Sequence, residues 1–345
     1  MLRPFPQVAL LLWWILCLAP AGLGGQGIEL VTQWPTVSAG GFTMAQVDSR
    51  GLLYLAGTST ASSFVSIHDL QSGRERGRLG RAGEGPGEYR HIMGLAVHAD
   101  SLAILDVRHG RISVYTPEHE LARTVRVPEV FAVGPGLGWS DRGFVFMGLR
   151  LSDPPPRVGR LFILEGDRQV APVSTYTGSA AGSQGNSFML ARDSLLVLRH
   201  QKLGAWLVGP RGEGSVIVSD TTYSVQVHRS LPYYISASDG AIAGWLEHGR
   251  LVTIHHRYPA DAVFPEVPIG TRPPPLDIEL VSVLRVVDRL TGELETEREL
   301  PIPVKGAFAP GLLWGYALEG LEVQFYVWRL SDYLEDGDQL CSDYQ

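Results

Sequence analysis

The chain has 345 residues, of which 45% are hydrophobic and 19% are charged, a composition that excludes an intrinsically disordered chain. Its 40 glycines and 23 prolines follow no fixed period, which excludes collagen and indicates a protein rich in turns. The formal net charge of −7 argues against a nucleic acid as partner, because phosphate backbones are bound by basic surfaces.

The first residues have the layout of a secretory signal peptide. The basic start at residues 1–3 is followed by an apolar run at residues 8–19 and a small-residue cleavage site at residues 19–21, as in secreted proteins. A membrane-spanning helix needs ~20 apolar residues, and Pro20 ends this run earlier. We therefore expect residues 1–21 to be a signal peptide, the protein to be secreted or periplasmic, and no membrane span to remain after cleavage.

Cysteine usage agrees with a mature chain that folds without disulfides. Cys17 lies within the expected signal peptide, so Cys341 alone would remain after cleavage. One cysteine can form neither an intrachain disulfide nor a cysteine-based metal site. The mature protein must therefore be stable through its hydrophobic core, and ~320 residues are enough for that.

Beyond the signal peptide the chain reads as short β-strands separated by turns. Runs rich in β-branched, aromatic and other apolar residues, such as residues 52–56, 102–107 and 322–328, are bounded by glycine, proline, aspartate or serine. This pattern is typical of strands rather than of helices. Many short strands at this spacing predict a sandwich, a barrel or a propeller.

A repeated phrase decides among these three architectures. It consists of a short strand, a tight acidic or glycine-containing turn and a strongly apolar strand. Its six copies are centred on Asp48, Asp100, Asp141, Asp193, Glu247 and Pro310. Propeller blades run ~40–50 residues each, and longer intervals are taken up by loops. We therefore predict an all-β protein, a six-bladed β-propeller of four-stranded antiparallel blades over residues 28–330, followed by a C-terminal tail at 331–345.

The two ends of the repeat region complement each other. After Pro310 the chain supplies two strong strands, at 312–316 and 322–328, whereas the strand at 28–34 precedes the first repeat and has no blade of its own. We predict that this N-terminal strand pairs into the last blade and closes the ring. Closure of this kind leaves no long open edge.

Two segments resemble known propeller proteins. Residues 106–115, which read DVRHGRISVY, resemble the NHL-repeat signature, an aspartate at a strand end followed by a turn and Arg-Ile-x-Val-aromatic. Residues 83–89, which read GEGPGEY, resemble a segment of bacterial exported six-bladed propellers related to NHL and TolB-like propellers. The resemblance is close over residues 80–127. It implies the fold and an export route but no single reaction, since members range from binding scaffolds to a few lyases and lactonases.

The loops differ between the two faces of the expected propeller. Turns between the first and second strands of a blade, and between the third and fourth, lie on one face and are short here. Loops between the second and third strands, and links between blades, lie on the other face and include 80–91, 151–159, 174–186, 219–237 and 256–279. Long loops in a compact domain are usually functional or disordered, and here they are concentrated on one face. We therefore predict that the long-loop face carries the binding site.

The candidate ligand-binding residues lie in or beside these loops. They are Glu84, Glu88, Arg90, His91, His109, His200, His228, His256 and Arg257. Imidazoles that converge on a propeller axis can bind a divalent metal or act as acid and base. The chain has no H-E-x-x-H motif or zinc-type cluster, and adjacent residues on a strand point to opposite faces, so His255 and His256 cannot easily share one metal. No metal site is assigned and no cofactor is predicted, with a divalent metal the one cofactor left open.

Two of the motifs also have a structural interpretation. Residues 83–89 lack the Lys-Ser/Thr of a phosphate-binding P-loop, so the glycines and Pro86 are expected to shape a turn and Tyr89 to pack inside. Asp106 and Arg111 flank a tight loop and are expected to pair across the hairpin.

Three functions remain open, and a binding or interaction propeller is favoured. It would recognise a small molecule, a peptide or an envelope protein on the long-loop face. The alternative is a metal-dependent lyase or lactonase with histidines and carboxylates at the axis. A periplasmic scaffold that contacts envelope proteins through its outer rim is the third. The chain lacks a Gly-x-Ser-x-Gly motif, so a serine hydrolase has no support.

Overall fold

A computed structural model describes most of the chain beyond its first 26 residues. The described residues are 27–36, 44–56, 63–127, 130–132, 136–140, 143–150, 158–165, 168–179, 186–191, 194–199, 205–208, 214–218, 239–257, 280–319, 322–331 and 333–334. Every regular element among them is a β-strand, so the all-β prediction is confirmed. The described part of the chain contains no helix long and apolar enough to cross a bilayer.

The described strands form five four-stranded sheets, one five-stranded sheet and one small ladder. Sheet 1 contains β2 (Met44–Val47), β3 (Leu52–Ala56), β4 (Val65–Asp69) and β5 (Glu75–Leu79). Sheet 2 contains β8 (Ile92–His98), β9 (Ser101–Asp106), β10 (Arg111–Tyr115) and β11 (Leu121–Arg126). Sheet 3 contains β12 (Val130–Ala132), β13 (Gly138–Ser140), β14 (Gly143–Arg150), β15 (Val158–Glu165) and β16 (Arg168–Ser179).

The later sheets follow the same order of strands. Sheet 4 contains β17 (Asn186–Ala191), β18 (Ser194–Arg199), β19 (Ala205–Val208) and β20 (Gly214–Val218). Sheet 5 contains β21 (Asp239–Glu247), β22 (Arg250–Arg257), β23 (Val281–Asp288) and β24 (Leu294–Leu300). Sheet 6 contains β25 (Val304–Ala309), β26 (Leu312–Glu319), β27 (Glu322–Leu330) and β1 (Ile28–Thr36). The small parallel ladder joins β6 (Arg81–Ala82) to β7 (Glu88–Tyr89).

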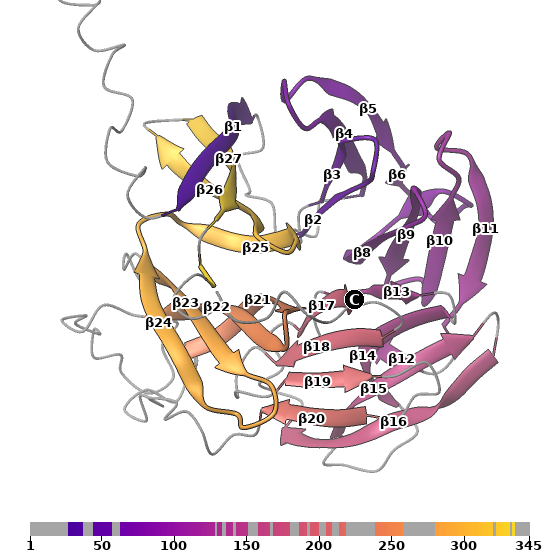
Figure 1. Cartoon of the computed structure of the whole chain (residues 1–345). Coiled ribbons are helices and arrows are strands. Elements are labelled where there is room, and N and C mark those ends of the chain that lie inside the picture. Colours follow the sequence, from indigo (N-terminus) through magenta and orange to yellow (C-terminus); the bar gives the residue numbers. More distant parts are fainter. Residues whose placement is uncertain are drawn as a thin grey trace, which may run out of the picture.

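The sheets are arranged around a common axis as a β-propeller (Figure 1). The first strand of each sheet contacts the first strand of the next, in the circuit β2, β8, β13, β17, β21, β25 and back to β2. In sheet 3 the first position is divided, because β12 and β13 both pair with β14. Neighbouring strands within the large sheets run antiparallel, as predicted.

The N-terminal strand completes sheet 6, as predicted. β1 pairs antiparallel with β27, from Ile28 opposite Leu330 to Thr36 opposite Val323. Trp34 of β1 stacks on Phe325 of β27 with 4.9 Å between the ring centroids and on His68 of sheet 1 with 5.1 Å. The first strand of the chain therefore joins the last sheet to the first.

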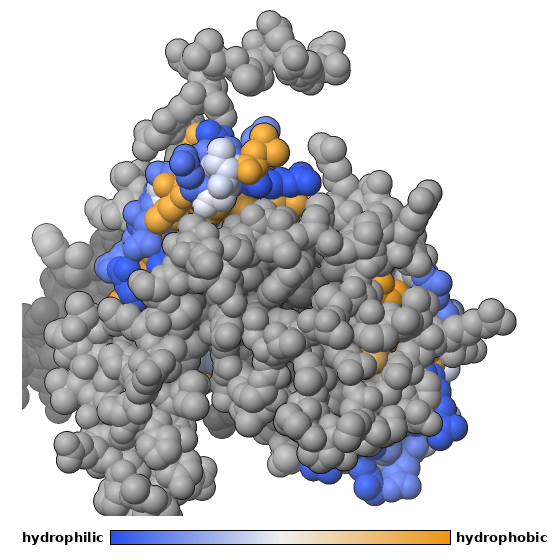
Figure 2. All heavy atoms as spheres, turned by 90° about the horizontal axis from the view of Figure 1, so that it is seen from below, coloured by the Kyte–Doolittle hydropathy of each residue, from blue (hydrophilic) through white to orange (hydrophobic). Residues whose placement is uncertain are grey.

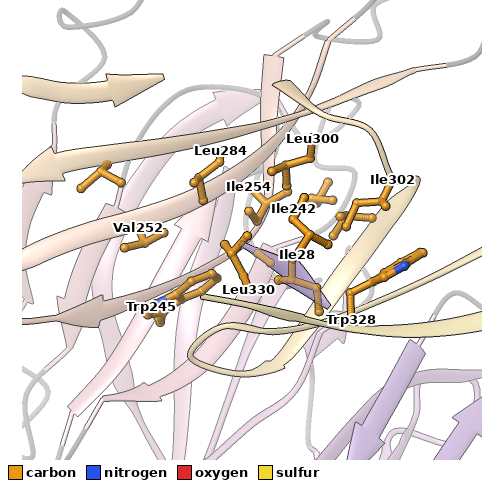
Figure 3. Packing of buried hydrophobic residues seen from close by; sticks show 14 residues of the cluster. Ile28, Ile242, Trp245, Val252, Ile254, Leu284, Leu300, Ile302, Trp328 and Leu330 are labelled. Carbon is orange, nitrogen blue, oxygen red and sulfur yellow. The ribbon is translucent and has the colours of Figure 1, made fainter. Parts of the chain in front are cut away.

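The hydrophobic core lies between neighbouring sheets. Between sheets 5 and 6, Ile254 and Leu284 pack with Ile28, Trp328 and Leu330 (Figure 3). The middle strands β22 and β23 are buried along most of their length, which explains their near-continuous apolar sequence. Burying one such large apolar side chain stabilises the fold by ~1.5–3 kcal/mol. The described surface seen from below is mainly hydrophilic, with smaller hydrophobic areas (Figure 2).

The connections between strands alternate between the two faces of the propeller, because neighbouring strands run in opposite directions. We call short-turn face the one that carries the turns between first and second and between third and fourth strands, such as residues 48–51, 70–74, 99–100 and 248–249. The long-loop face carries the links between sheets and the loops between second and third strands. Of the loops predicted for it, all of 219–237, most of 151–159 and 256–279, and residues 180–185 of 174–186 lie outside the described residues.

Three predicted loop boundaries were wrong. β16 extends to Ser179, β15 begins at Val158 and β22 reaches Arg257, so parts of the loops expected at 174–186, 151–159 and 256–279 are strand. The link at 80–91 also contains the two-residue strands β6 and β7. Backbone pairing extends these strands past the point where the apolar pattern stops.

The segment after β27 packs on sheet 5. Leu334 and Tyr333 lie against the core between sheets 5 and 6, and the Tyr333 hydroxyl donates to Glu247 Oε2. Ser331 donates its amide to Gly27 O at 2.6 Å. The first residues of the expected tail at 331–345 are therefore part of the folded body.

Candidate functional site

One buried carboxylate organises the long-loop face of sheet 2. Asp106, at the end of β9, is 0% exposed. Its Oδ1 accepts hydrogen bonds from the amides of Arg108 at 3.0 Å, His109 at 3.3 Å and His91 at 3.3 Å, and Oδ2 accepts from the amide of Arg90 at 2.9 Å. A buried carboxylate without such donors is very costly. Asp106 therefore fixes the loop after β9 to the end of the link at 80–91.

His109 is held by the same carboxylate. Its Nδ1 lies 2.7 Å from Asp106 Oδ2, and a carboxylate in that position places the ring proton on Nδ1. The side chain is 15% exposed, and Nε2 is buried without a hydrogen-bond partner in the described part of the chain. The His109 ring therefore supports the loop that carries Arg108, and its Nε2 atom is buried.

Arg111 anchors the link at 80–91 to sheet 2. Its guanidinium donates to Glu84 O at 3.1 Å, to Gly85 O at 2.7 Å and to Glu88 O. Arg111 and Asp106 are register partners on β10 and β9, yet the predicted pairing of their side chains was wrong. The amides and His109 occupy the Asp106 carboxylate, so Arg111 binds backbone carbonyl oxygens instead.

The glycine-rich segment of the link is a shaped turn, as its structural interpretation predicted. Gly87 has φ +70°, and a Cβ at Gly83 would lie 2.1 Å from Glu88 Oε2. Tyr89 is 0% exposed and its hydroxyl lies 2.7 Å from that of Tyr115. Burial raises the pKa of the Tyr89 hydroxyl, so it stays protonated.

The acidic candidates in the link are held by arginines. Glu88 accepts the amide of Gly85 at 2.8 Å and pairs with Arg81 at 2.7 Å, and these two partners lower the pKa of its carboxyl. Glu84 pairs with Arg90, whose side chain is 58% exposed. Both ion pairs are open to solvent, and such pairs contribute little stability.

The structure brings five of the nine candidate residues together. Glu84, Glu88, Arg90, His91 and His109 all lie in the link or the loop that Asp106 and Arg111 hold in place. His200 and His228 lie outside the described residues.

The two candidates of sheet 5 lie apart from this group. His256 Nε2 is 2.6 Å from Val304 O of sheet 6. Arg257 pairs with Glu297 at 3.1 Å and Glu299 at 2.6 Å. Both residues lie at the end of β22, the second strand of its sheet, and therefore at the same face as the loop after β9, which is also a second strand.

Sequence reasoning missed the role of Arg108, and it gave Arg111 a structural role with the wrong partner. Arg108 is exposed, and no partner for its side chain is found among the described residues. The dipeptide Arg-His occurs at 90–91 and 108–109, and again at 199–200, so its repetition was only a weak signal. Nothing local in the sequence shows that one aspartate brings the first two dipeptides together.

A second polar network, on the short-turn face, was also missed. The Tyr54 hydroxyl lies 3.0 Å from Asp48 Oδ2 and 3.0 Å from His119 Nε2, and Arg50 binds Asp48 Oδ2 at 2.6 Å. Burial lowers the pKa of His119, and the Arg50 guanidinium lowers it further. This network joins sheets 1 and 2 at the opposite face.

In the part of the chain that the structure describes, no three His, Cys, Asp or Glu side chains are grouped so that they could hold a metal ion. His109 and Asp106 form one close pair there.

Comparison with known proteins bears on the fold. A member of the DUF4221 family from Bacteroides vulgatus matches with a TM-score of 0.52 and 12% identity, over 88% of this chain and 98% of that chain. A candidate exported protein from Bacteroides fragilis matches with a TM-score of 0.50 and 10% identity, over 89% of this chain and 96% of that chain. These likenesses show a shared fold alone. No family model and no curated protein matches the chain.

Proposed function

We propose that this protein is an exported six-bladed β-propeller, related to NHL and TolB-like propellers, that binds a ligand on its long-loop face. Six blades are supported by the circuit of first strands and by the divided first position of sheet 3. Export is supported by the signal-peptide layout of residues 1–21 and by the likeness to the candidate exported protein of Bacteroides fragilis.

The observation that carries the binding function is the rigid polar group at the end of sheet 2. Asp106 accepts hydrogen bonds from backbone amides of the link and the loop. Arg111 donates to backbone carbonyl oxygens of the link. The side chains that they position, Arg90 and Arg108, are exposed and play no part in the core. Polar loop residues held in place by a rigid scaffold are typical of a binding site.

The experiment compares capture by the full chain and by two variants. Arg90→Ala removes an exposed cation and Arg257→Ala a half-buried one. The ion pairs of both arginines are screened by solvent, so the melting temperature should change little. Immobilised protein is incubated with envelope extract and with low-molecular-weight solutes of the culture, and retained molecules are quantified by mass spectrometry. We expect retention by the wild type to fall in both variants.

Arg76→Ala is the matched control. Arg76 forms a comparable ion pair with Asp69 at 2.8 Å and is 51% exposed, but it lies near the start of β5, next to the turn at 70–74 on the short-turn face. If Arg90→Ala and Arg257→Ala retain as much as the wild type, the result would favour a scaffold that contacts its partners through the outer rim. A large fall in melting temperature would show that the loops are structural.

The enzyme alternative is tested by metal content. A lyase or lactonase of the kind proposed needs a bound divalent ion. Protein purified without chelator or histidine tag should hold no stoichiometric divalent ion after dialysis, and retention of one would favour the enzyme.

A further inference from the structure

Basic residues gather at the long-loop ends of the second strands. Because the turn before each second strand lies on the short-turn face, every second strand ends at the long-loop face. Among these strands, β14 ends at Arg150, β18 at Arg199 and β22 at Arg257, and β9 is followed by Arg108 and His109. β3 ends at Ala56 and β26 at Glu319, so these basic residues belong to sheets 2 to 5. In sheet 5 the charge of Arg257 is neutralised by Glu297 and Glu299.

The opposite face has the opposite character. Its described turns and adjoining strand ends carry more carboxylates than guanidinium groups: Asp48, Asp69, Asp100, Glu118, Glu120, Glu247, Asp288 and Glu293 against Arg50, Arg74, Arg250 and Arg289. The chain as a whole has a net charge of −7. Basic residues at one face of an acidic protein produce a local positive potential that attracts anions.

At sheet 2 the positive charge exceeds what local carboxylates neutralise. The backbone amides of Arg90 and Arg108 lie 2.9 and 3.0 Å from the Asp106 carboxylate. The backbones of the two arginines are therefore close together. Glu84 and Glu88 pair with Arg90 and Arg81. Arg111 donates to carbonyl oxygens. The four guanidinium groups of Arg81, Arg90, Arg108 and Arg111 therefore face the three carboxylates of Glu84, Glu88 and Asp106.

Arg108 is the cation best placed for a ligand. It is exposed, and the described residues offer its guanidinium no carboxylate. Its loop is held by Asp106 and His109, so little conformational freedom of the backbone is lost on binding. A guanidinium presents a planar fork of donors that matches carboxylate, sulfate and phosphate groups.

We propose that the ligand of this face is anionic and places a carboxylate, sulfate or phosphate group against Arg108, with Arg90 beside it. This inference rests on the proposed binding function and adds the chemical class of the ligand. Arg90 would exchange its exposed partner Glu84 for the oxyanion.

The test is calorimetric titration of the full-length protein with citrate, sulfate and inorganic phosphate at low ionic strength. We expect at least one of the three to bind the wild type, with an affinity that falls as sodium chloride is added. Arg108→Ala should weaken binding about tenfold, the usual effect of losing a hydrogen bond to a charged group, and Arg108→Glu should abolish it. The anion that binds best identifies the group that the natural ligand carries.

Arg123→Ala is the matched control, since Arg123 is an exposed arginine of the same sheet on its outer strand. It should leave the affinity within about twofold, as expected for a distant surface charge. The inference is overturned if none of the three anions binds, if Arg108→Ala binds like the wild type, or if Arg123→Ala loses as much.

The two proposals can fail separately. If extract molecules are retained by the wild type and lost with Arg90→Ala, yet none of the anions binds, the binding function stands and the anionic class is wrong. If the anions bind through Arg108 but nothing is retained from extract or culture, the anion site stands and the broader function is contradicted.

Discussion

Asp106 shows how one side chain can impose the geometry of a loop face. Four backbone amides and the His109 ring converge on a carboxylate that solvent does not reach. Each hydrogen bond to a charged acceptor is worth more than one between neutral groups. The residues that the carboxylate positions are exposed, so positioning and ligand contact belong to different residues.

Asp106→Ala should therefore be strongly destabilising. The four amides would lose their acceptor inside the protein, and one buried unsatisfied group costs ~1–3 kcal/mol. We expect the free energy of unfolding to fall by about 2–4 kcal/mol, measured by urea denaturation. Asp106→Asn, whose carboxamide oxygen can still accept, should lose less. Equal urea midpoints for wild type and Asp106→Ala would contradict the role of the carboxylate.

His119 makes the stability of the fold depend on pH. Its pKa is lowered in the folded state by burial and then by Arg50, whereas an unfolded chain has an ordinary histidine value near 6.5. The folded state thus binds protons less readily than the unfolded state. Stability is therefore fully present above the unfolded value and is lost as the pH falls through it toward the folded value.

His119→Asn should flatten that dependence. His119 has φ +67°, a backbone conformation that asparagine tolerates. The loss of melting temperature between neutral pH and pH values below about 6 should be smaller in the variant than in the wild type, because a histidine of lowered pKa is absent. Parallel pH profiles for the two proteins would show that His119 does not contribute.

At the scale of elements, burial decided which strands could be read from the sequence. The middle strands β3, β9 and β22 are mostly buried, and their apolar runs indicated them directly. The outer strands β5 and β24 were missed, since their exposed positions carry charged residues. β24 has glutamates at 295, 297 and 299, which pair with Arg250, Arg285 and Arg257 of the two preceding strands β22 and β23.

The link at 80–91 also combines a feature that the sequence predicted with one that it did not. Its glycines and proline predicted a shaped turn, and Gly87 and Tyr89 confirm it. The contacts that hold the turn come from Arg111, more than twenty residues further on. Local sequence predicts the shape of such a turn, but its anchor lies on another strand.

At the scale of the whole molecule, the fold depends on the contact between the two ends of the chain. β1 supplies Trp34 to a core cluster that also contains Phe325 of sheet 6 and Leu53 of sheet 1. β1 also covers the edge of β27. β1, which precedes all the first strands in sequence, therefore forms the outer strand of sheet 6 and stabilises the contact between sheets 6 and 1.

Removing β1 should therefore weaken the entire propeller. A chain that begins at Gly27 keeps the strand, and one that begins after Thr36 loses it together with the Trp34 stack. Loss of a buried tryptophan alone costs ~3–5 kcal/mol, and the bared edge of β27 favours aggregation. We expect a clearly lower melting temperature and increased light scattering for the shorter chain. Equal melting temperatures would show that ring closure does not depend on β1.

The sequence by itself determined the class of the fold, the positions of the turns between first and second strands, and the pairing of the N-terminal strand with residues 322–328. These depend on local patterns of burial and turn residues, and on a strand left without a partner. Only the tertiary structure decided that the Asp106 carboxylate binds four backbone amides and not the Arg111 side chain. It also decided that the amides of Arg90 and Arg108 bind the same carboxylate. Hydrogen bonds between segments distant along the chain form in three dimensions, so no local pattern of residue types encodes them.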